Sequence, residues 1–195
     1  MKRKIVIMIL GVAILLSGCG SRSADLQEPS NSAESSTIDQ TETNSKGNTE
    51  PEESVFPGNY TVPDGWVKWD EYSTEEKVFY VEDGQGENEY PDNISVNFGT
   101  NRYSAKEHER FRDAIVQQLL AQLEGVDAQL NGDGTYTEQG YILYIFTIDE
   151  QEAVTKQYYV VNDYEYCLVH VTNFSKSESV YEAAQSIVDS LVWDG

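Results

Sequence analysis

The sequence predicts an α+β domain, in which an antiparallel sheet of about six or seven strands carries packed helices. Three observations lead to this prediction. Short apolar segments are separated by turn signals such as the Pro-Asp-Gly sequence at 63–65, a pattern typical of strands joined by hairpins. A long helical pattern follows the first strands, and a second helical pattern ends the chain.

Residues 1–18, which precede this domain, are predicted to be a signal peptide. Three basic residues at positions 2–4 are followed by an uncharged apolar run over 5–16, shorter than the roughly 20 residues that span a bilayer. The run ends in Leu-Ser-Gly-Cys at 16–19, which resembles the lipobox of bacterial lipoproteins and implies an acyl lipid, such as palmitate, on Cys19. We therefore expect a lipid-anchored protein on the extracytoplasmic face of a membrane. The alternative, an ordinary secretory signal, also leads out of the cytoplasm.

Residues 19–55 are expected to form the lipidated cysteine and a disordered tether. The segment after Cys19 is rich in Ser, Thr, Glu, Asn and Gln and has no aromatic residue that could seed a core. Its composition resembles the tethers of Gram-positive lipoproteins. Without the three basic residues of the signal peptide, the chain has 34 acidic and 10 basic side chains, a formal charge of −24. This charge excludes the usual nucleic-acid binding and favours solubility, cations or basic partners.

Residues 56–195 have the length of one domain with a single core. A short strand is expected at 60–62 before the Pro-Asp-Gly turn, and a second at 66–71. Further strands are predicted at 77–82 and 93–98, separated by a polar loop at 83–88.

A helix is predicted from Ser104 to Gly125. The Ser104 hydroxyl can cap the first turn while the Glu107 carboxylate reaches back, and glycine favours the left-handed backbone that ends a helix. Apolar residues recur every fourth position and give the helix one buried face: Phe111, Ile115, Leu119 and Leu123, with Ala114 beside them.

The remaining elements follow from apolar spacing and turn signals. A strand is expected at 126–130, a turn at 131–134 (Asn-Gly-Asp-Gly), and a strand at 140–148 that is apolar on both faces and should therefore lie centrally. Strands at 156–161 and 164–172 are expected to form a hairpin. A final helix from about Glu178 has its apolar residues at helical spacing: Val180, Ala184, Ile187 and Leu191.

Three short motifs in this layout resemble the PsbP-like superfamily. They are VPDGW at 62–66, NISV at 93–96 before the long helix, and SLVW at 190–193. The superfamily includes photosystem II extrinsic proteins, a Ran-binding import factor and many small bacterial lipoproteins. The resemblance implies a PsbP-like domain over 56–195 whose relatives mainly bind or organise other proteins, and it implies no site residues here.

The sequence contains no motif that indicates catalysis or a cofactor. There is no Gly-x-Ser-x-Gly or Ser-x-x-Lys motif, and acidic residues follow the Gly-x-Gly at 84–86, where they would repel a phosphate. Cys167 lies in an apolar run and is interpreted as a core residue. His108 and His170 lie in different elements without metal-ligand spacing, so we expect a partly buried structural histidine at 108 and a sheet-surface histidine at 170.

Two further features keep ligand binding open. The acidic loops at 83–89 and 131–134 offer oxygen ligands for calcium, although neither has the EF-hand spacing. Trp66, Trp69 and Tyr72 could stack on sugar rings or anchor a protein, although we expect at least two of the three to pack in the core. If the strand continues that far, alternation would place Trp66 and Tyr72 on one face and Trp69 on the other.

The function we predict is a non-catalytic, membrane-anchored lipoprotein that binds or supports an envelope protein near its membrane. The alternative is a ligand-binding module for a cation or a cell-wall saccharide. An enzyme is the third class, because distant segments can bring two carboxylates together without a sequence motif.

Overall fold

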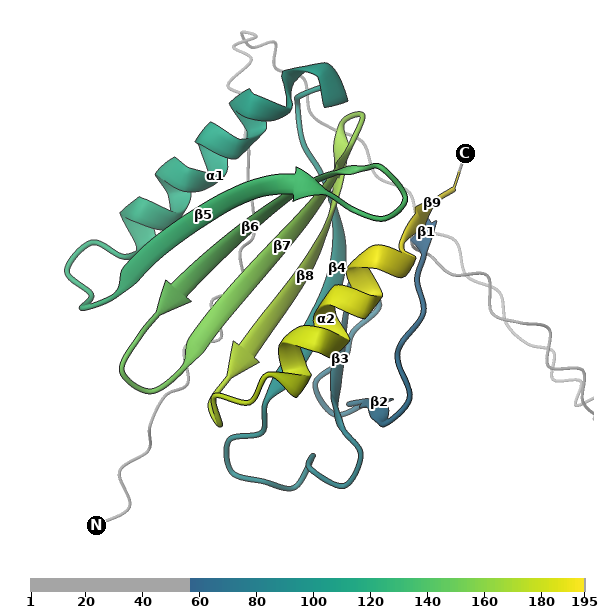
Figure 1. Cartoon of the computed structure of the whole chain (residues 1–195), viewed down its shortest axis with the longest axis vertical. Coiled ribbons are helices and arrows are strands. Elements are labelled where there is room, and N and C mark those ends of the chain that lie inside the picture. The colour runs from purple at the N-terminus through teal and green to yellow at the C-terminus, as the bar shows by residue number, and fades with distance from the viewer. Residues whose placement is uncertain (1–56, 195) are drawn as a thin grey trace, which may run out of the picture. The chain divides into compact units, whose positions relative to one another are not determined.

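The computed structural model describes residues 57–194, which form a seven-stranded antiparallel sheet with one helix on each face (Figure 1). The strand order is β2-β3-β4-β8-β7-β6-β5, and a separate ladder pairs β1 with β9. The predicted α+β class is confirmed. The elements are β1 (Gly58–Asn59), β2 (Trp66–Lys68), β3 (Lys77–Glu82), β4 (Asn93–Thr100), the 3-10 helix η1 (Ala105–Glu107), α1 (His108–Gln122), β5 (Gln129–Tyr136), β6 (Ile142–Asp149), β7 (Val154–Asn162), β8 (Glu165–Asn173), α2 (Ser179–Ser190) and β9 (Val192–Trp193).

Helix α2 covers one face of the sheet, and the main core lies beneath it. Successive strand residues point to opposite faces, so every second residue of β3, β4, β7 and β8 belongs to this side. The helix contributes Val180, Ala183, Ala184, Ile187, Val188 and Leu191 to the same buried cluster. The predicted spacing of the last helix is therefore the spacing of its buried face.

Helix α1 covers part of the opposite face. Its Phe111 ring packs against Tyr159 of β7 and Tyr166 of β8, with ring centroids 5.8 and 5.5 Å apart. Phe111, Ile115 and Leu119 are buried, as the four-residue repeat predicts. The capping box of Ser104 and Glu107 is present, but it caps η1, and α1 itself ends at Gln122, before the left-handed Gly125.

Three glycines on the α1 face lie directly opposite aromatic residues. Gly99 pairs with Tyr166, Gly132 with Phe146 and Gly134 with Tyr144. A Cβ atom at Gly132 or Gly134 would lie 3.1 Å from the partner ring, and one at Gly99 would lie only 2.4 Å from Tyr166. The aromatic rings thus occupy the space that a side chain on the neighbouring strand would need.

This pairing corrects three sequence predictions. The Asn-Gly-Asp-Gly segment at 131–134 is not a turn; it lies within β5 and pairs with β6 along its length. The predicted strand at 126–130 accordingly begins only at Gln129 and continues through the glycines. The two-sided apolar strand β6 is not central but second from the edge, since β5 lies outside it.

The opening strands also differ from the prediction. β2 ends at Lys68, three residues before the predicted end, and the short strand expected at 60–62 is replaced by the Gly58–Asn59 strand that pairs with β9. The hairpin of β7 and β8 forms as predicted and turns through Tyr164, whose φ is 61°. Among residues 57–194, no helix is long and apolar enough to cross a membrane.

Candidate binding surface

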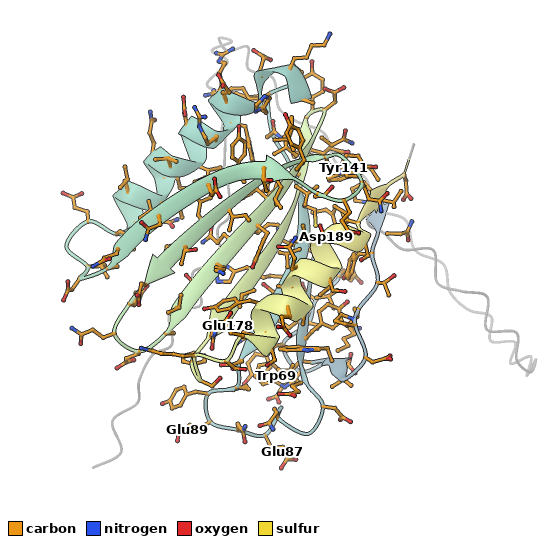
Figure 2. The ribbon with its side chains drawn as sticks, viewed as in Figure 1. Trp69, Glu87, Glu89, Tyr141, Glu178 and Asp189 are labelled. Atoms are coloured by element: carbon orange, nitrogen blue, oxygen red, sulfur yellow. The ribbon has the colours of Figure 1, made fainter. Side chains whose placement is uncertain are left out.

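Two loops meet at the end of the sheet where the chain leaves β3 and β8, and a third, the β2–β3 loop, begins next to them at Trp69, whose amide donates a hydrogen bond to the Phe79 carbonyl of β3 (Figure 2). The β3–β4 loop is tied to the loop before α2 by Asp92, whose carboxylate accepts hydrogen bonds from the Phe174 and Ser175 amides at 2.7 and 2.9 Å and from the Ser175 hydroxyl. Charged acceptors of this kind make the stronger hydrogen bonds in proteins, so the two loops are held as one unit.

Aromatic side chains pair on these loops. The rings of Trp69 and Tyr72 are in contact, with centroids 4.0 Å apart and planes inclined at 45°, and the centroid of the Tyr90 ring lies 5.7 Å from that of Phe174. Tyr72 is 43% exposed and Tyr90 is 37% exposed. We call these four residues the aromatic end.

The β3–β4 loop also packs on Trp69. A Cβ atom at Gly86 would lie 3.6 Å from the Trp69 indole nitrogen and 3.5 Å from Val81, so the loop backbone lies against the indole. Figure 2 shows Trp69, Glu87 and Glu89 together at this end of the domain. The exposed carboxylates around the aromatic end are those of Asp70, Glu71, Glu82, Asp83, Glu87 and Glu89.

The predicted alternation of the three aromatic residues was wrong. Because β2 ends at Lys68, Trp69 and Tyr72 both belong to the following loop, where they contact each other instead of pointing to opposite faces. Trp66 alone keeps a strand position and packs against the core under α2. Because β2 is only three residues long, Tyr72 lies in a loop and is exposed.

His108 has the structural role that its position predicts. It is half-buried at the start of α1, and its Nδ1 atom lies 2.6 Å from the Tyr144 hydroxyl of β6. This bond fixes the first turn of α1 to the sheet.

His170 lies on the α1 face of β8, between Ser95 of β4 and Gln157 of β7. Burial, and then the nearby charge of Lys77, lower the pKa of this imidazole to about 4. Lys77 is half-buried over the Phe79 ring at 5.0 Å, and burial lowers its pKa as well. The histidine is therefore neutral at physiological pH and sits in a polar row of the sheet rather than on an open surface.

Cys167 is fully buried under α2, as predicted for a core residue. Burial raises the pKa of its thiol, which disfavours the thiolate that nucleophilic chemistry and metal binding require. Cys19, the predicted lipidation site, lies outside the described residues.

No cation site is built in the acidic loops that the structure describes. Within residues 57–194, no three His, Cys, Asp or Glu side chains converge as metal ligands would. The segment at 131–134 is strand, and the Asp133 carboxylate there accepts a hydrogen bond from the Gly134 amide at 2.8 Å. The β3–β4 loop turns through the left-handed Gly84, with Asn88 bonded to Gln85.

Two shallow depressions mark the described surface. One, of about 200 Å³, is lined by Pro57, Glu75, Glu76, Phe98, Gly99, Thr100 and Glu165. The other, of about 260 Å³, is lined by Asp127, Ala128, Gln129, Asp149, Glu150, Gln151 and Lys176. Both are smaller than the roughly 300–1,000 Å³ of usual ligand pockets, and neither contains the aromatic end.

Comparison with known proteins gives similarity of structure only. No family model and no curated protein matches the chain. A solution structure of cyanobacterial PsbP (CyanoP) from Synechocystis sp. PCC 6803 is similar over 70% of this chain and 86% of that one, with 15% identity and a TM-score of 0.43. A crystal structure from Bacteroides thetaiotaomicron is similar over 70% of this chain, with 12% identity and a TM-score of 0.39; the match spans 45% of that protein. The first of these neighbours is a PsbP protein.

Proposed function

We propose that this protein is a membrane-anchored extracytoplasmic lipoprotein that binds an envelope protein through the aromatic end, without catalysing a reaction. The proposal is carried by two aromatic pairs, each with one exposed tyrosine, on loops that contact one another. Aromatic residues are enriched in protein interfaces and provide much of the binding free energy there.

The aromatic end is organised before it meets a partner. Asp92 ties two of the three loops together, and Gly86 packs the β3–β4 loop on Trp69. Ordering a loop on binding costs free energy, so loops that are already held in place leave more of the contact energy for affinity.

The charge around the aromatic end indicates the chemistry of the partner. Exposed carboxylates flank the aromatic residues along the β2–β3 and β3–β4 loops, and acidic loops attract a surface that carries Lys or Arg. Cationic side chains can also lie over exposed tyrosine rings. We therefore expect a partner with a basic contact surface.

The proposal of a lipid anchor is supported by the sequence alone. Its support is the order of basic residues, apolar run and lipobox over residues 1–19. Metabolic labelling with a palmitate analogue should mark the wild-type chain and not Cys19→Ser. Labelling of both chains would show that a residue other than Cys19 carries the lipid. Labelling of neither chain would favour an ordinary secretory signal.

Crosslinking in whole cells, followed by purification from membranes, tests the partner. The wild-type chain should recover a reproducible protein, and the double variant Tyr72→Ala/Tyr90→Ala should lose it. Tyr136→Ala is the matched control, since Tyr136 is 68% exposed on β5, away from the three loops. Recovery of no reproducible protein, or equal recovery by all three chains, would contradict the proposal.

The contacting pair of Trp69 and Tyr72 also supports the alternative, a cell-wall saccharide ligand, because sugar rings stack on aromatic faces. Thermal melting of the protein with calcium, zinc and wall fragments separates the alternatives. A rise in melting temperature with a wall fragment, lost in Tyr72→Ala, would favour the saccharide; a rise with a metal ion alone would favour the cation.

A further inference from the structure

Basic side chains of the described domain are concentrated in one segment. Residues 57–194 contain 26 acidic and eight basic side chains, and the basic ones are Lys68, Lys77, Arg102, Lys106, Arg110, Arg112, Lys156 and Lys176. Residues 102–113 hold four of these eight with three acidic ones, a net charge of +1, whereas the rest of 57–194 has a net charge of −19. We call Arg102, Lys106, Arg110 and Arg112 the basic segment.

Two arginines of the basic segment are positioned by one tyrosine. The guanidinium carbons of Arg102 and Arg110 lie 5.2 and 5.5 Å from the centroid of the Tyr103 ring. Arg102 also donates a hydrogen bond to the Tyr103 hydroxyl at 3.0 Å. Tyr103 is only 6% exposed, so both guanidinium groups rest on a buried ring instead of moving freely in solvent.

Three carboxylates next to this segment are engaged within the protein, whereas Glu109, inside the segment, is exposed and has no ion pair within 4.0 Å among residues 57–194. Glu107 accepts hydrogen bonds from Ser104 and pairs with Arg110 at 2.6 Å. Asp163 accepts a hydrogen bond from the Ala105 amide at 2.8 Å, and Asp113 pairs with Arg112 at 2.7 Å. Within residues 57–194, no carboxylate lies within 4.0 Å of the charged nitrogens of Arg102 or Lys106.

The basic segment and the aromatic end lie at opposite ends of β4. The β3–β4 loop precedes Asn93 and the basic segment follows Thr100, so the eight-residue strand separates them by roughly 26 Å (Figure 1). This is more than twice the Debye length of about 8 Å at physiological ionic strength, and an anion at the basic segment is therefore largely screened from the carboxylates of the β3–β4 loop. Glu75, Glu76 and Glu165 lie nearer, around the depression beside Thr100.

We infer that the basic segment binds a linear phosphodiester polymer of the cell envelope. The planar donors of arginine match the geometry of phosphate oxygens, and each phosphodiester carries a full negative charge. A slender chain can contact Arg102 and Lys106, which have no carboxylate within 4.0 Å among residues 57–194. A flat anionic bilayer would instead bring the surrounding acidic surface within the Debye length, where repulsion outweighs four basic side chains.

This site is independent of the aromatic end and of the protein partner proposed above, but it rests on the extracytoplasmic location proposed there. A chain that binds a protein at one end and a wall polymer at the other would hold that partner at a defined place in the envelope.

The test is the binding of fluorescent poly(glycerol phosphate) to the full chain in nanodiscs of phosphatidylcholine, followed by anisotropy. Arg102→Gln/Lys106→Gln should weaken binding at least tenfold and make the dependence of affinity on salt shallower. Lys68→Gln/Lys176→Gln removes the same charge elsewhere and should change affinity less than twofold. Equal melting temperatures of the two variants exclude unfolding as the cause.

Three results would overturn the inference. The first is that the wild-type chain does not bind the polymer. The second is an equal loss of affinity in both double variants, which would reflect net charge and not a site. The third is displacement of the polymer by poly-L-glutamate or by phosphatidylglycerol vesicles as efficiently as by unlabelled polymer, which would assign the basic segment to an acidic protein or to the membrane.

Discussion

Replacement of Gly99 by alanine should destabilise the domain because the Tyr166 ring occupies the position of the new methyl group. An ideal Cβ at Gly99 would lie 2.4 Å from Cζ and Oη of Tyr166 and 2.8 Å from its Cε1. Carbon atoms in contact prefer about 3.5–4.0 Å, so the ring would have to move by roughly 1 Å or more. Tyr166 is 4% exposed and packs between Phe111 and Tyr159, which leaves it little room.

The magnitude follows from two opposing effects. Overpacking of a core costs about 1–3 kcal/mol. Alanine in place of glycine lowers the entropy of the unfolded chain and so stabilises the folded state by about 0.4–1 kcal/mol. This gain applies here because the φ of Gly99 is outside the left-handed region. We expect a net loss of about 1–2 kcal/mol in the free energy of unfolding and a melting temperature lower by roughly 3–8 °C.

Urea denaturation of the variant measures this loss, and two further variants test its cause. Gly86→Ala is the matched control, because its nearest neighbour would lie at 3.5 Å, and it should stay within about 0.5 kcal/mol of the wild type. In a Tyr166→Leu background the clashing atoms are gone, so Gly99→Ala should be neutral or stabilising there. Wild-type stability of Gly99→Ala, or the same loss in both backgrounds, would refute the reasoning.

Three other changes test the packing, the histidine and the loop tie. Phe111→Ala should cost about 3–5 kcal/mol in urea denaturation because it removes the ring between Tyr159 and Tyr166, whereas Leu120→Ala, at a 56% exposed position of the same helix, should cost less than about 1 kcal/mol. His170 has a folded pKa of about 4, below its unfolded value of 6.5, so the wild type should lose stability as pH falls from about 6.5 to 4; one pKa unit is 1.36 kcal/mol, and partial exposure reduces the loss to about 2 kcal/mol. His170→Gln should lack this part of the slope, and an unchanged slope would contradict the assignment. Asp92→Ala should speed amide hydrogen exchange at Phe174 and Ser175 and cost about 1–3 kcal/mol; unchanged exchange would show that the tie does not hold the loops.

The two helices were predictable because their signals are local. The four-residue repeat of Phe111, Ile115 and Leu119 defines a buried face whatever the helix packs against, and the capping box fixes where the helical segment begins. The burial of Cys167 followed in the same way from the apolar run around it.

The edge strand was not predictable in this way. Asn-Gly and Asp-Gly favour tight turns in isolation, and that preference gave the wrong assignment for 131–134. Within the sheet, Gly132 and Gly134 instead lie beside Phe146 and Tyr144, and the ladder to β6 continues through them. Pairing with a neighbouring strand overrode the local turn preference, as it commonly does for β structure.

The candidate surfaces also combine features that local sequence predicts with features that depend on tertiary contacts. The sequence by itself determined the acidic charge, the apolar faces of the helices, the α+β class and the lipobox that predicts the anchor at Cys19, because each depends on composition or on spacing within one segment. Only the tertiary structure decided that Trp69 contacts Tyr72, that Asp92 ties two loops, and that the guanidinium groups of two arginines lie over the Tyr103 ring. The physical reason is that such contacts depend on where strands end and how they pair, and pairing between distant segments leaves no periodic trace in the sequence.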